Sequence, residues 1–450
     1  MANREATDGL VMAATPSLDR AVDSARRLFD EIRTASRDGD GVTRDPFGKG
    51  EQAAHDIVLR EARRLGLEVK VDAALNAWMV WPGRNRDLPR IVIGSHLDSV
   101  RRGGNYDGLA GVLAGLAVVE TMMGDARFPR CDFAVLAIRG EENAWFGAQH
   151  VGSRALFGKL DAATMDAARR LDTGRPLGEH MAEAGADTQR IATREPLVDV
   201  RTIAMYLECH IEQGPALLEA GFPIGLVTAI RGNRRCANMV CRGEYGHSGI
   251  VPRVARRDAV MADADFAMRL HRYRADVDAA GGDLVATIGR FNTDAAHHGV
   301  TVIPGEVRFC LDVRGHDEAL LDDAWAFVQH ALDTVAQARG VVFEQGPNTS
   351  DAAVHLHGGL RQMLRQGCEA LGIETMEMAS GAGHDVGDFA QAGIPSALVF
   401  IRNENGSHNP AEAMEMEDFA EAVRLLARTV SDAACTDSPR AVELERSELA

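Results

Sequence analysis

The sequence lacks features that would place it in a membrane or in an export pathway. No stretch approaches the roughly 18 uninterrupted apolar residues that a membrane helix requires. The N-terminal segment MANREATDGLVMAATPSLDR carries acidic residues where a signal peptide has a basic and then an apolar region. We therefore expect a protein without a membrane anchor that stays in the cytoplasm.

Paired cysteines and an excess of basic charge are also absent. The seven cysteines are scattered and form no CxxC pair, which is typical of reduced thiols in a cytosolic protein rather than of a disulfide framework. The formal net charge of -17 at pH 7 repels nucleic-acid phosphates and anionic lipids. A slight cluster of Arg231, Arg234 and Arg235 is explained by a solvated or a substrate-facing strand end. We expect neither a nucleic-acid nor a membrane partner.

The order of apolar segments predicts an α/β fold. Helical spacing over residues 17–67 is followed by strands at 67–73, 76–83 and 90–96, and then by a helix rich in small residues. Another apolar strand, within 131–143, ends in charged residues. This alternation predicts a mixed sheet that is covered by helices.

The chain is too long for one ordinary hydrophobic core, and the order of its predicted strands and helices changes in the middle. Its 450 residues indicate two domains. Residues 229–345 have the strand and helix order of a split βαβ, ferredoxin-like α+β unit. We therefore predict that this segment is inserted in a catalytic domain made of residues 1–228 and 346–450. The polar stretch 436–450 is predicted to be a loose tail.

Polar residues stand where three of the apolar segments end or begin. In GSHLDSV, Asp98 is placed to hold the second ring nitrogen of His96, although a surface loop explains this common pair equally well. In GGNYDGLAGV, Asp107 lies in a glycine-flanked turn, where Asp usually caps the following helix. In GEEN, adjacent Glu141 and Glu142 point in different directions, so that one can bind metal while the other faces a reacting water. Two exposed acids are the simpler alternative for the last pair.

Two more fragments, ECHIEQGP and GSHNPAE, add His210 and His408. Each fragment is weak evidence by itself. Together the fragments supply three histidines and three carboxylates, which suit two borderline metal ions that share one carboxylate. We expect two divalent ions per subunit, zinc or manganese, with cobalt or nickel as alternatives.

These motifs, taken in order with GEYGHSG, VIPGEV and SGAGHD, resemble the M20 metallopeptidase superfamily. The similarity runs over nearly the whole chain. HIEQGP and SGAGHD mark the hydantoinase/carbamoylase branch, which contains N-carbamoyl-L-amino acid hydrolases, allantoate amidohydrolases and β-ureidopropionases. The resemblance implies a catalytic domain of the zinc-peptidase type and an inserted domain that serves as lid and dimerisation surface.

The resemblance also implies roles for the matching positions. Five residues would be metal ligands, with Asp107 bridging the two ions: His96 and His210 on one ion, Glu142 and His408 on the other. Glu141 and Asp98 would belong to the catalytic machinery, with Glu141 as the general base. His247 would reach the active site of a partner subunit and polarise the scissile carbonyl, which implies a homodimer. A surface histidine at a strand end is the alternative for His247.

Substrate contacts are implied at four more positions. Arg314 matches an arginine that grips the substrate carboxylate, and Gln213 and His384 match residues that line the pocket. An ion pair with Asp312 is the alternative for Arg314, and a hydrogen bond within the glycine-rich loop is the alternative for His384. Thr301 stands where the family usually has a substrate-binding Asn.

Two further departures fall on substrate-facing segments. The family's usual Gly-Ser-Arg after the paired glutamates is replaced by Asn143, Ala144 and Trp145, and its Gly-Thr-Thr-Pro-Met by GIVPR. Tyr106 and Trp145 are interpreted as packing residues, and the adjacent His297 and His298 are left unassigned.

The expected activity is hydrolysis of a linear C–N amide bond in a small N-carbamoyl or ureido acid, which releases ammonia and carbon dioxide. An aminoacylase or dipeptidase-like hydrolase of N-acyl amino acids on the same fold is the nearest alternative, because the departures affect the substrate side. A non-catalytic binding protein is the second alternative. Such proteins typically lose metal ligands or the base, whereas all six residues are retained here.

Overall fold

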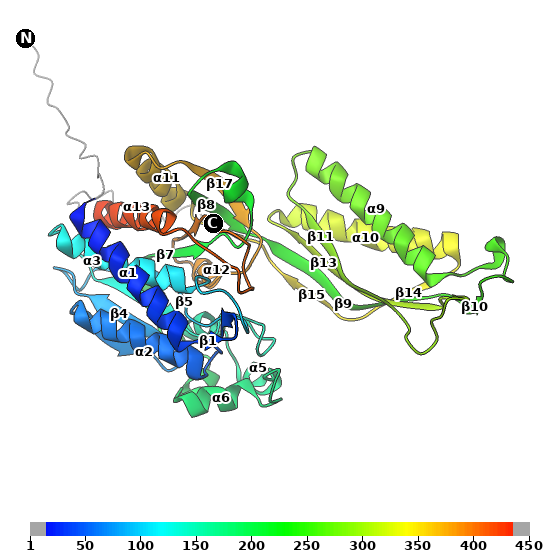
Figure 1. Ribbon diagram of the computed structural model, residues 1–450, viewed down its shortest axis with the longest axis horizontal. Coiled ribbons are helices and arrows are strands. Elements are labelled where there is room, and N and C mark those ends of the chain that lie inside the picture. The colour runs from blue at the N-terminus through cyan, green and yellow to red at the C-terminus, as the bar shows by residue number, and fades with distance from the viewer. Residues whose placement is uncertain (1–14, 435–450) are drawn as a thin grey trace, which may run out of the picture. The chain divides into compact units, whose positions relative to one another are not determined.

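The computed structural model describes residues 15–434, which divide into two compact units (Figure 1). Within the described chain, the first unit comprises residues 15–228, 356–378 and 384–434, and the second comprises 229–355 and 379–383. The second unit extends past the predicted boundary at 345, because the strand at Asn348–Asp351 still pairs with its sheet. The predicted tail at 436–450 and Cys435 lie outside the described residues.

The elements of the first unit include both ends of the chain that the structure describes. Its strands are β1 (Arg37–Asp38), β2 (Gly41–Val42), β3 (Glu68–Val71), β4 (Ala77–Trp81), β5 (Arg90–His96), β6 (Phe133–Ile138), β7 (Ile203–Ile211), β8 (Ile224–Ile230), β17 (Thr375–Ser380) and β18 (Ser396–Ile401), of which β8 and β17 run on into the second unit. Its helices are α1 (Pro16–Ala35), α2 (Lys49–Arg64), α3 (Leu109–Gly124), α4 (Val151–Leu156), α5 (Ala162–Ala167), α6 (Leu177–Ala184), α7 (Thr188–Ala192), the 3₁₀ turn η1 (Val200–Thr202), α8 (Ala216–Ala220), α11 (Gly358–Leu371), α12 (Val386–Gln391) and α13 (Met416–Ala434).

A mixed sheet forms the centre of the first unit, with strand order β8-β18-β7-β5-β6-β4-β3. The four middle strands are parallel: β18 to β7, β7 to β5 and β5 to β6. β4 and β3 continue the sheet in antiparallel fashion. The carboxyl ends of β5, β6, β7 and β18 therefore meet at one edge, which is where ligands bind in open α/β sheets.

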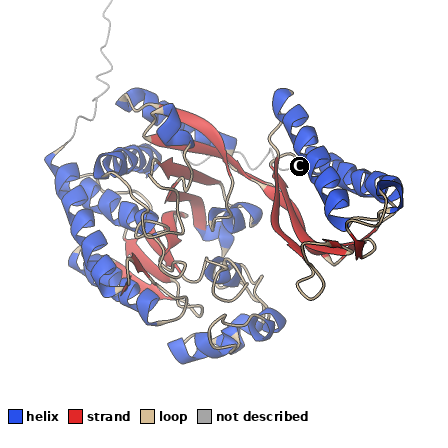
Figure 2. Ribbon diagram, turned by 45° about the vertical axis from the view of Figure 1, so that its right-hand side comes forward, coloured by secondary structure: helices blue, strands red, loops and turns tan. Residues whose placement is uncertain are grey.

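Helices cover both faces of this sheet (Figure 2). Alternate residues of β7 pack on opposite sides, as strand geometry requires. Leu207 belongs to the large apolar core that also contains residues of α1, α3 and α13, whereas the ring of Tyr206 stacks on Phe389 of α12 at a centroid distance of 3.6 Å. The parallel strands are buried along almost their whole length, and the sequences of β6 and β18 are nearly continuous apolar runs for that reason.

α3 packs against β5, β6 and β7, and small residues form much of its surface. A Cβ on Gly111 would stand 2.1 Å from the carbonyl oxygen of Cys209 in β7. Only glycine permits this approach, which brings the N-terminal turn of α3 next to the ends of β5 and β7.

The second unit is an antiparallel sheet with two long helices packed against it (Figure 1). Its elements are β9 (Gly232–Arg242), β10 (Gly246–His247), η2 (Arg253–Ala255), α9 (Ala259–Ala279), β11 (Val285–Thr293), β12 (Val302–Ile303), β13 (Glu306–Gly315), α10 (Glu318–Arg339), β14 (Val342–Gln345), β15 (Asn348–Asp351) and β16 (Val354–His355). The strand order β11-β13-β9-β14 is that of a split βαβ fold. Along β13, buried Val307, Phe309 and Leu311 alternate with more exposed residues, as expected for a sheet covered on one face.

The predicted fold class, a mixed α/β protein, is confirmed, and the strands predicted at 67–73 and 76–83 are β3 and β4. Two features were missed. β7, the central strand, carries polar Glu208 and His210 that obscured its apolar pattern, and α4 to α8 are only five to eight residues long, too short to show a helical period. No helix within residues 15–434 is long and apolar enough to cross a membrane.

The burial of one ionisable side chain in the second unit, Asp263, predicts how the free energy of unfolding depends on pH. Asp263 of α9 is fully buried beside Ala262 and Phe266, and neither of its carboxylate oxygens has a hydrogen-bond partner. Burial raises its pKa to about 8. An unfolded chain releases this proton near pH 3.9. The free energy of unfolding should therefore fall as the pH rises from about 4 to about 8, and level off above that.

We expect Asp263→Asn, which cannot ionise, to flatten this pH dependence. Guanidinium unfolding of both proteins at pH 5 and pH 8 measures the effect, because the wild type should lose more stability between the two pH values than the variant. Equal losses in the two proteins would show that Asp263 does not titrate in this range.

Candidate metal centre

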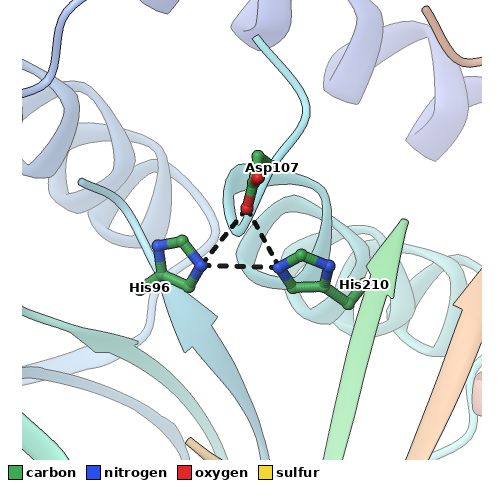
Figure 3. A group of neighbouring side chains, drawn as sticks. All are labelled: His96, Asp107 and His210. Carbon is green, nitrogen blue, oxygen red and sulfur yellow. Dashed lines mark hydrogen bonds and ion pairs between the residues drawn. The ribbon is translucent and has the colours of Figure 1, made fainter. Parts of the chain in front are cut away.

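Two groups of ligand atoms meet at Asp107, which lies in the turn between β5 and α3. The first group is formed by Asp107, His96 at the end of β5 and His210 near the end of β7 (Figure 3). Asp107 Oδ1 is 3.5 Å from His96 Nε2 and 3.2 Å from His210 Nε2, and the two ring nitrogens are 3.4 Å apart. All three side chains are buried.

The second group uses the other oxygen of the same carboxylate. His408 Nε2 is 3.4 Å from Asp107 Oδ2 and 3.3 Å from Glu142 Oε1. Glu142 Oε1 is buried and has no hydrogen-bond partner, whereas the side chain of His408 is 51% exposed. The second group is therefore open to solvent on the side of His408.

The spacing of these atoms fits metal coordination. Two ligand atoms that are each about 2.0–2.1 Å from a tetrahedral zinc ion lie roughly 3.3–3.4 Å apart. Five of the six separations within the two groups fall between 3.2 and 3.5 Å. Imidazole and carboxylate donors are also the set that suits borderline divalent ions. Each group therefore offers a set of donors that suits a divalent cation.

The distal nitrogens of the two buried imidazoles are held by acceptors. His210 Nδ1 is 2.8 Å from the carbonyl oxygen of Ile211, and His96 Nδ1 is 3.1 Å from the carbonyl oxygen of Asp98 and 3.3 Å from its carboxylate. A proton on each Nδ1 leaves the lone pair of Nε2 pointing into the first group.

Asp98 does more than orient His96. Its two carboxylate oxygens accept hydrogen bonds from the backbone N–H groups of Glu141 and Glu142, each at 3.0 Å. One buried carboxylate thus fastens the end of β5 to the segment that follows β6. The sequence predicted the contact with His96 but not the link to the paired glutamates.

The Asp107 turn is fixed by residues far away in sequence. Glu412 accepts hydrogen bonds from the backbone N–H groups of Tyr106 and Asp107, and the single hydroxyl proton of Ser407 lies within reach of both Glu412 Oε2 and Asp107 Oδ2. Fully buried Arg44 donates to the carbonyl oxygen of Asp107. Asp107 does not cap α3 through its side chain. GSHNPAE contained Glu412, but nothing in the sequence singled out Arg44.

Glu141 stands beside the first group without being part of it. Its Oε2 is 3.9 Å from His96 Nε2, and its Oε1 is 3.3 Å from Nε2 of His150, a residue that the sequence analysis did not identify. Burial raises the pKa of Glu141, but the neighbouring histidines, with the hydrogen bond from His150 first among them, outweigh burial and lower the pKa to about 2. The carboxylate is therefore ionised and able to accept a proton.

Two predicted pocket residues lie in the first unit close to the ligand groups. Gln213, with a left-handed backbone (φ 65°), donates from Nε2 to Asp107 Oδ2 at 2.8 Å, and its buried Oε1 has no hydrogen-bond partner. The ring of His384 is 4.5 Å from that of His210, and burial keeps its pKa well below the ordinary value. The structure thus brings Gln213 and His384 to the edge of the centre.

Three other predicted residues belong to the second unit. His247 and Thr301 are exposed. Arg314 makes the alternative ion pair: its Nε and NH2 contact Asp312 Oδ2, and its NH1 donates to the carbonyl oxygen of Gly381.

The remaining candidates have ordinary structural partners. Trp145 is buried, donates to the carbonyl oxygen of Ser99 and stacks under Arg170, and the ring of Tyr106 packs on Phe29. Three arginines and two histidines are engaged locally: Arg231 with Asp283, Arg234 with Glu318, Arg235 with Asp312, His297 with Asp294 and His298 with Thr293. The arginine cluster is therefore paired with acids rather than solvated freely.

Comparisons with known proteins agree with this architecture. Residues 92–432 match the model of peptidase family M20/M25/M40. The chain is 34% identical to an N-carbamoyl-L-amino acid amidohydrolase of Geobacillus stearothermophilus, over 90% of this chain and 96% of that protein. It is 31% identical to the allantoate amidohydrolase of Escherichia coli, over 80% and 85% of the respective chains. A crystal structure of a hydantoinase/carbamoylase family amidase from Burkholderia multivorans superposes with a TM-score of 0.83 and 28% identity, covering 92% of this chain and 98% of the other.

A glycine beside the first group provides a test of this geometry. Gly108 has φ +67°, and a Cβ there would stand 2.4 Å from Cε1 of the His96 ring. We expect Gly108→Ala to displace His96 and to weaken the binding of one divalent ion at least tenfold, as measured by competition with a metal-sensitive dye. Gly66→Ala is the matched control, because Gly66 has φ +78° with no atom within 4 Å of the added Cβ. Unchanged affinity in Gly108→Ala would contradict the assignment of His96 as a ligand.

Proposed function

The chain belongs to peptidase family M20/M25/M40, in its hydantoinase/carbamoylase branch, and on this basis we propose that it is a metal-dependent hydrolase of small N-carbamoyl or ureido acids. It is an amidohydrolase that acts on carbon–nitrogen bonds other than peptide bonds. The observation that carries the metal dependence is the position of Asp107, whose two oxygens each face a separate set of donors at coordination spacing.

Two divalent ions would be held by the two groups, with Asp107 shared between them. His96 and His210 would complete the first site, and Glu142 and His408 the second. When bound, the ions supply Lewis-acid polarisation of the substrate carbonyl and make water a stronger acid. The donors suit zinc or manganese, and also cobalt or nickel.

Glu141 is the proposed general base. Its carboxylate is ionised, belongs to neither ligand group, and has Oε2 on the side of His96. It would accept the proton of the attacking water and return it to the leaving nitrogen, which is the role of a positioned acid–base residue in amide hydrolysis. Asp98 would keep this carboxylate in place through the hydrogen bond from the backbone N–H of Glu141.

The substrate class is inferred from the relatives. The names N-carbamoyl-L-amino acid amidohydrolase, allantoate amidohydrolase and ureidoglycolate hydrolase, carried by three of these relatives, all denote substrates that combine a ureido group with a carboxylate. Hydrolysis of such a group releases ammonia and carbon dioxide. Gln213 and His384, at the edge of the centre, are the proposed contacts in the first unit.

The second unit would supply the remaining contacts. Arg314 is proposed to grip the substrate carboxylate in bidentate fashion, for which it must exchange its present partner Asp312. Thr301 would face the substrate. The exposed His247 is proposed to act on the carbonyl in a second copy of the chain, which makes the working enzyme a homodimer. We propose a cytoplasmic location for it.

Metal stoichiometry tests the shared carboxylate. After dialysis against zinc or manganese and removal of free metal, we expect elemental analysis to find two ions per chain in the wild type. His210→Ala and His408→Ala should each retain one ion, because each removes a ligand from one group only. Asp107→Ala should lose both ions. Two ions retained in Asp107→Ala would contradict the bridging role.

Activity separates the proposed reaction from the alternatives. A panel of N-carbamoyl amino acids, N-acetyl amino acids and allantoate should give ammonia from the ureido substrates. Glu141→Gln should lower kcat by roughly 10²–10⁴-fold, the usual contribution of a general base, while metal content stays unchanged. Amine release from N-acetyl substrates without ammonia release from the ureido compounds would favour an aminoacylase. Full activity in Glu141→Gln would contradict its role as the base.

A further inference from the structure

The ring of His150 lies between two carboxylates. Its Nε2 is 3.3 Å from Glu141 Oε1, and its Nδ1 is 2.9 Å from Asp388 Oδ2. The side chain is only 12% exposed. Ionised carboxylates only accept hydrogen bonds, so a ring that bonds to both must carry a proton on each nitrogen. Burial opposes that charge, but the hydrogen bonds to Asp388 and Glu141 raise the pKa of His150 well above its ordinary value.

The main chain of His150 contacts Glu141, as its ring does. The backbone N–H of His150 donates to the carbonyl oxygen of Glu141 at 2.9 Å, and the next N–H, of Val151, donates to Gly140 at 2.8 Å. His150 itself has a left-handed conformation, φ 55° and ψ 38°, which non-glycine residues adopt only in particular contexts. This conformation and the two backbone hydrogen bonds fix where the ring begins relative to Glu141.

The far side of the ring is anchored as well. Asp388 lies in α12 and is 7% exposed. Its Oδ1 accepts from Lys159 Nζ at 3.3 Å, and its Oδ2 lies 3.3 Å from Ser153 Oγ, whose shorter contact is with Asp385 Oδ1 at 2.6 Å. Asp388 therefore has little freedom to follow His150, and the imidazole is held at both nitrogens.

The contact with His150 fixes the orientation of the Glu141 carboxylate. The terminal torsion of a glutamate is broad and roughly two-fold, so a free carboxylate samples many orientations. Here His150 contacts Oε1, and Oε2 is the oxygen on the side of His96, 3.9 Å from its Nε2. One oxygen is thus anchored and the other is left for proton transfer.

We propose that His150 is a positioning residue for Glu141, and that the Asp388–His150 pair holds the base with Oε2 turned toward the ligand groups. The inference rests on the proposed function, because it assigns a role to Glu141 in catalysis. His150 does not touch the reacting atoms. Its effect should therefore appear in turnover and not in substrate or metal affinity.

We expect His150→Phe to lower kcat about 10- to 100-fold, the cost of misplacing a catalytic group by about an ångström. KM and metal content should stay within about twofold of the wild type. The kcat of His150→Gln, which keeps one N–H donor toward Glu141, should lie between the kcat of the wild type and that of His150→Phe. His180→Phe is the matched control, because His180 lies in the same unit, packs edge-on against Phe146 and should leave kcat unchanged.

A double-mutant cycle distinguishes positioning from a general structural effect. If His150 acts through Glu141, adding His150→Phe to Glu141→Gln should not lower the residual kcat further. Asp388→Asn should also lower kcat in the wild type but not in the Glu141→Gln background. The loss of kcat should be smaller than in His150→Phe, because the amide oxygen still accepts from Nδ1 but carries no charge. If His150→Phe does not fold, the kcat of Asp388→Asn tests the positioning role by itself.

The outcomes separate this inference from the proposed function. Unchanged kcat in His150→Phe and Asp388→Asn, or equal losses in the wild-type and Glu141→Gln backgrounds, would overturn the positioning role while Glu141 remained the base. Full activity of Glu141→Gln would instead overturn the proposed function. A loss of kcat in His150→Phe that disappears in the Glu141→Gln background supports the inference.

Discussion

The sharing of one buried carboxylate between two donor groups is the constraint on which the structure of the centre depends. Asp107 presents Oδ1 to two imidazoles and Oδ2 to a third imidazole and a glutamate. Several close carboxylates in a buried position would repel one another without positive charge between them. Hydrogen bonds from Gln213, Ser407 and the turn held by Glu412 keep Asp107 in place, but they do not neutralise it. Divalent cations bound by the two groups would do so.

The fold brings these groups together through its parallel strands. β5, β6, β7 and β18 all end at one edge of the sheet, so residues distant in sequence become neighbours there. The close approach of α3, which depends on Gly111, sets the Asp107 turn against the ends of β5 and β7. Beside these strand ends, the Asp98 carboxylate accepts hydrogen bonds from the backbone N–H groups of Glu141 and Glu142 and so fixes where the two neighbouring side chains begin.

Much of this could be predicted from the sequence, because strands that end in polar residues leave a local pattern. His96, Glu141 and Glu142 were placed in this way, and the apolar runs predicted the α/β fold. The supporting residues could not be predicted, since their partners are far away along the chain. His150 meets Asp388, and Arg44 meets Asp107, only after folding, and neither contact leaves a periodic signal. For Arg314 the sequence left two alternatives open, a contact with the substrate carboxylate and an ion pair with Asp312. The structure contains the ion pair.

The most direct test of the account is the position of the bound ions. Crystals grown with zinc or manganese, measured at the absorption edge of that metal, should give two anomalous peaks per chain on either side of the Asp107 carboxylate. Their separation should be about 3.5–4 Å, as in other two-metal hydrolytic sites. A single peak, or peaks away from Asp107, would contradict the claim that this carboxylate joins two metal sites.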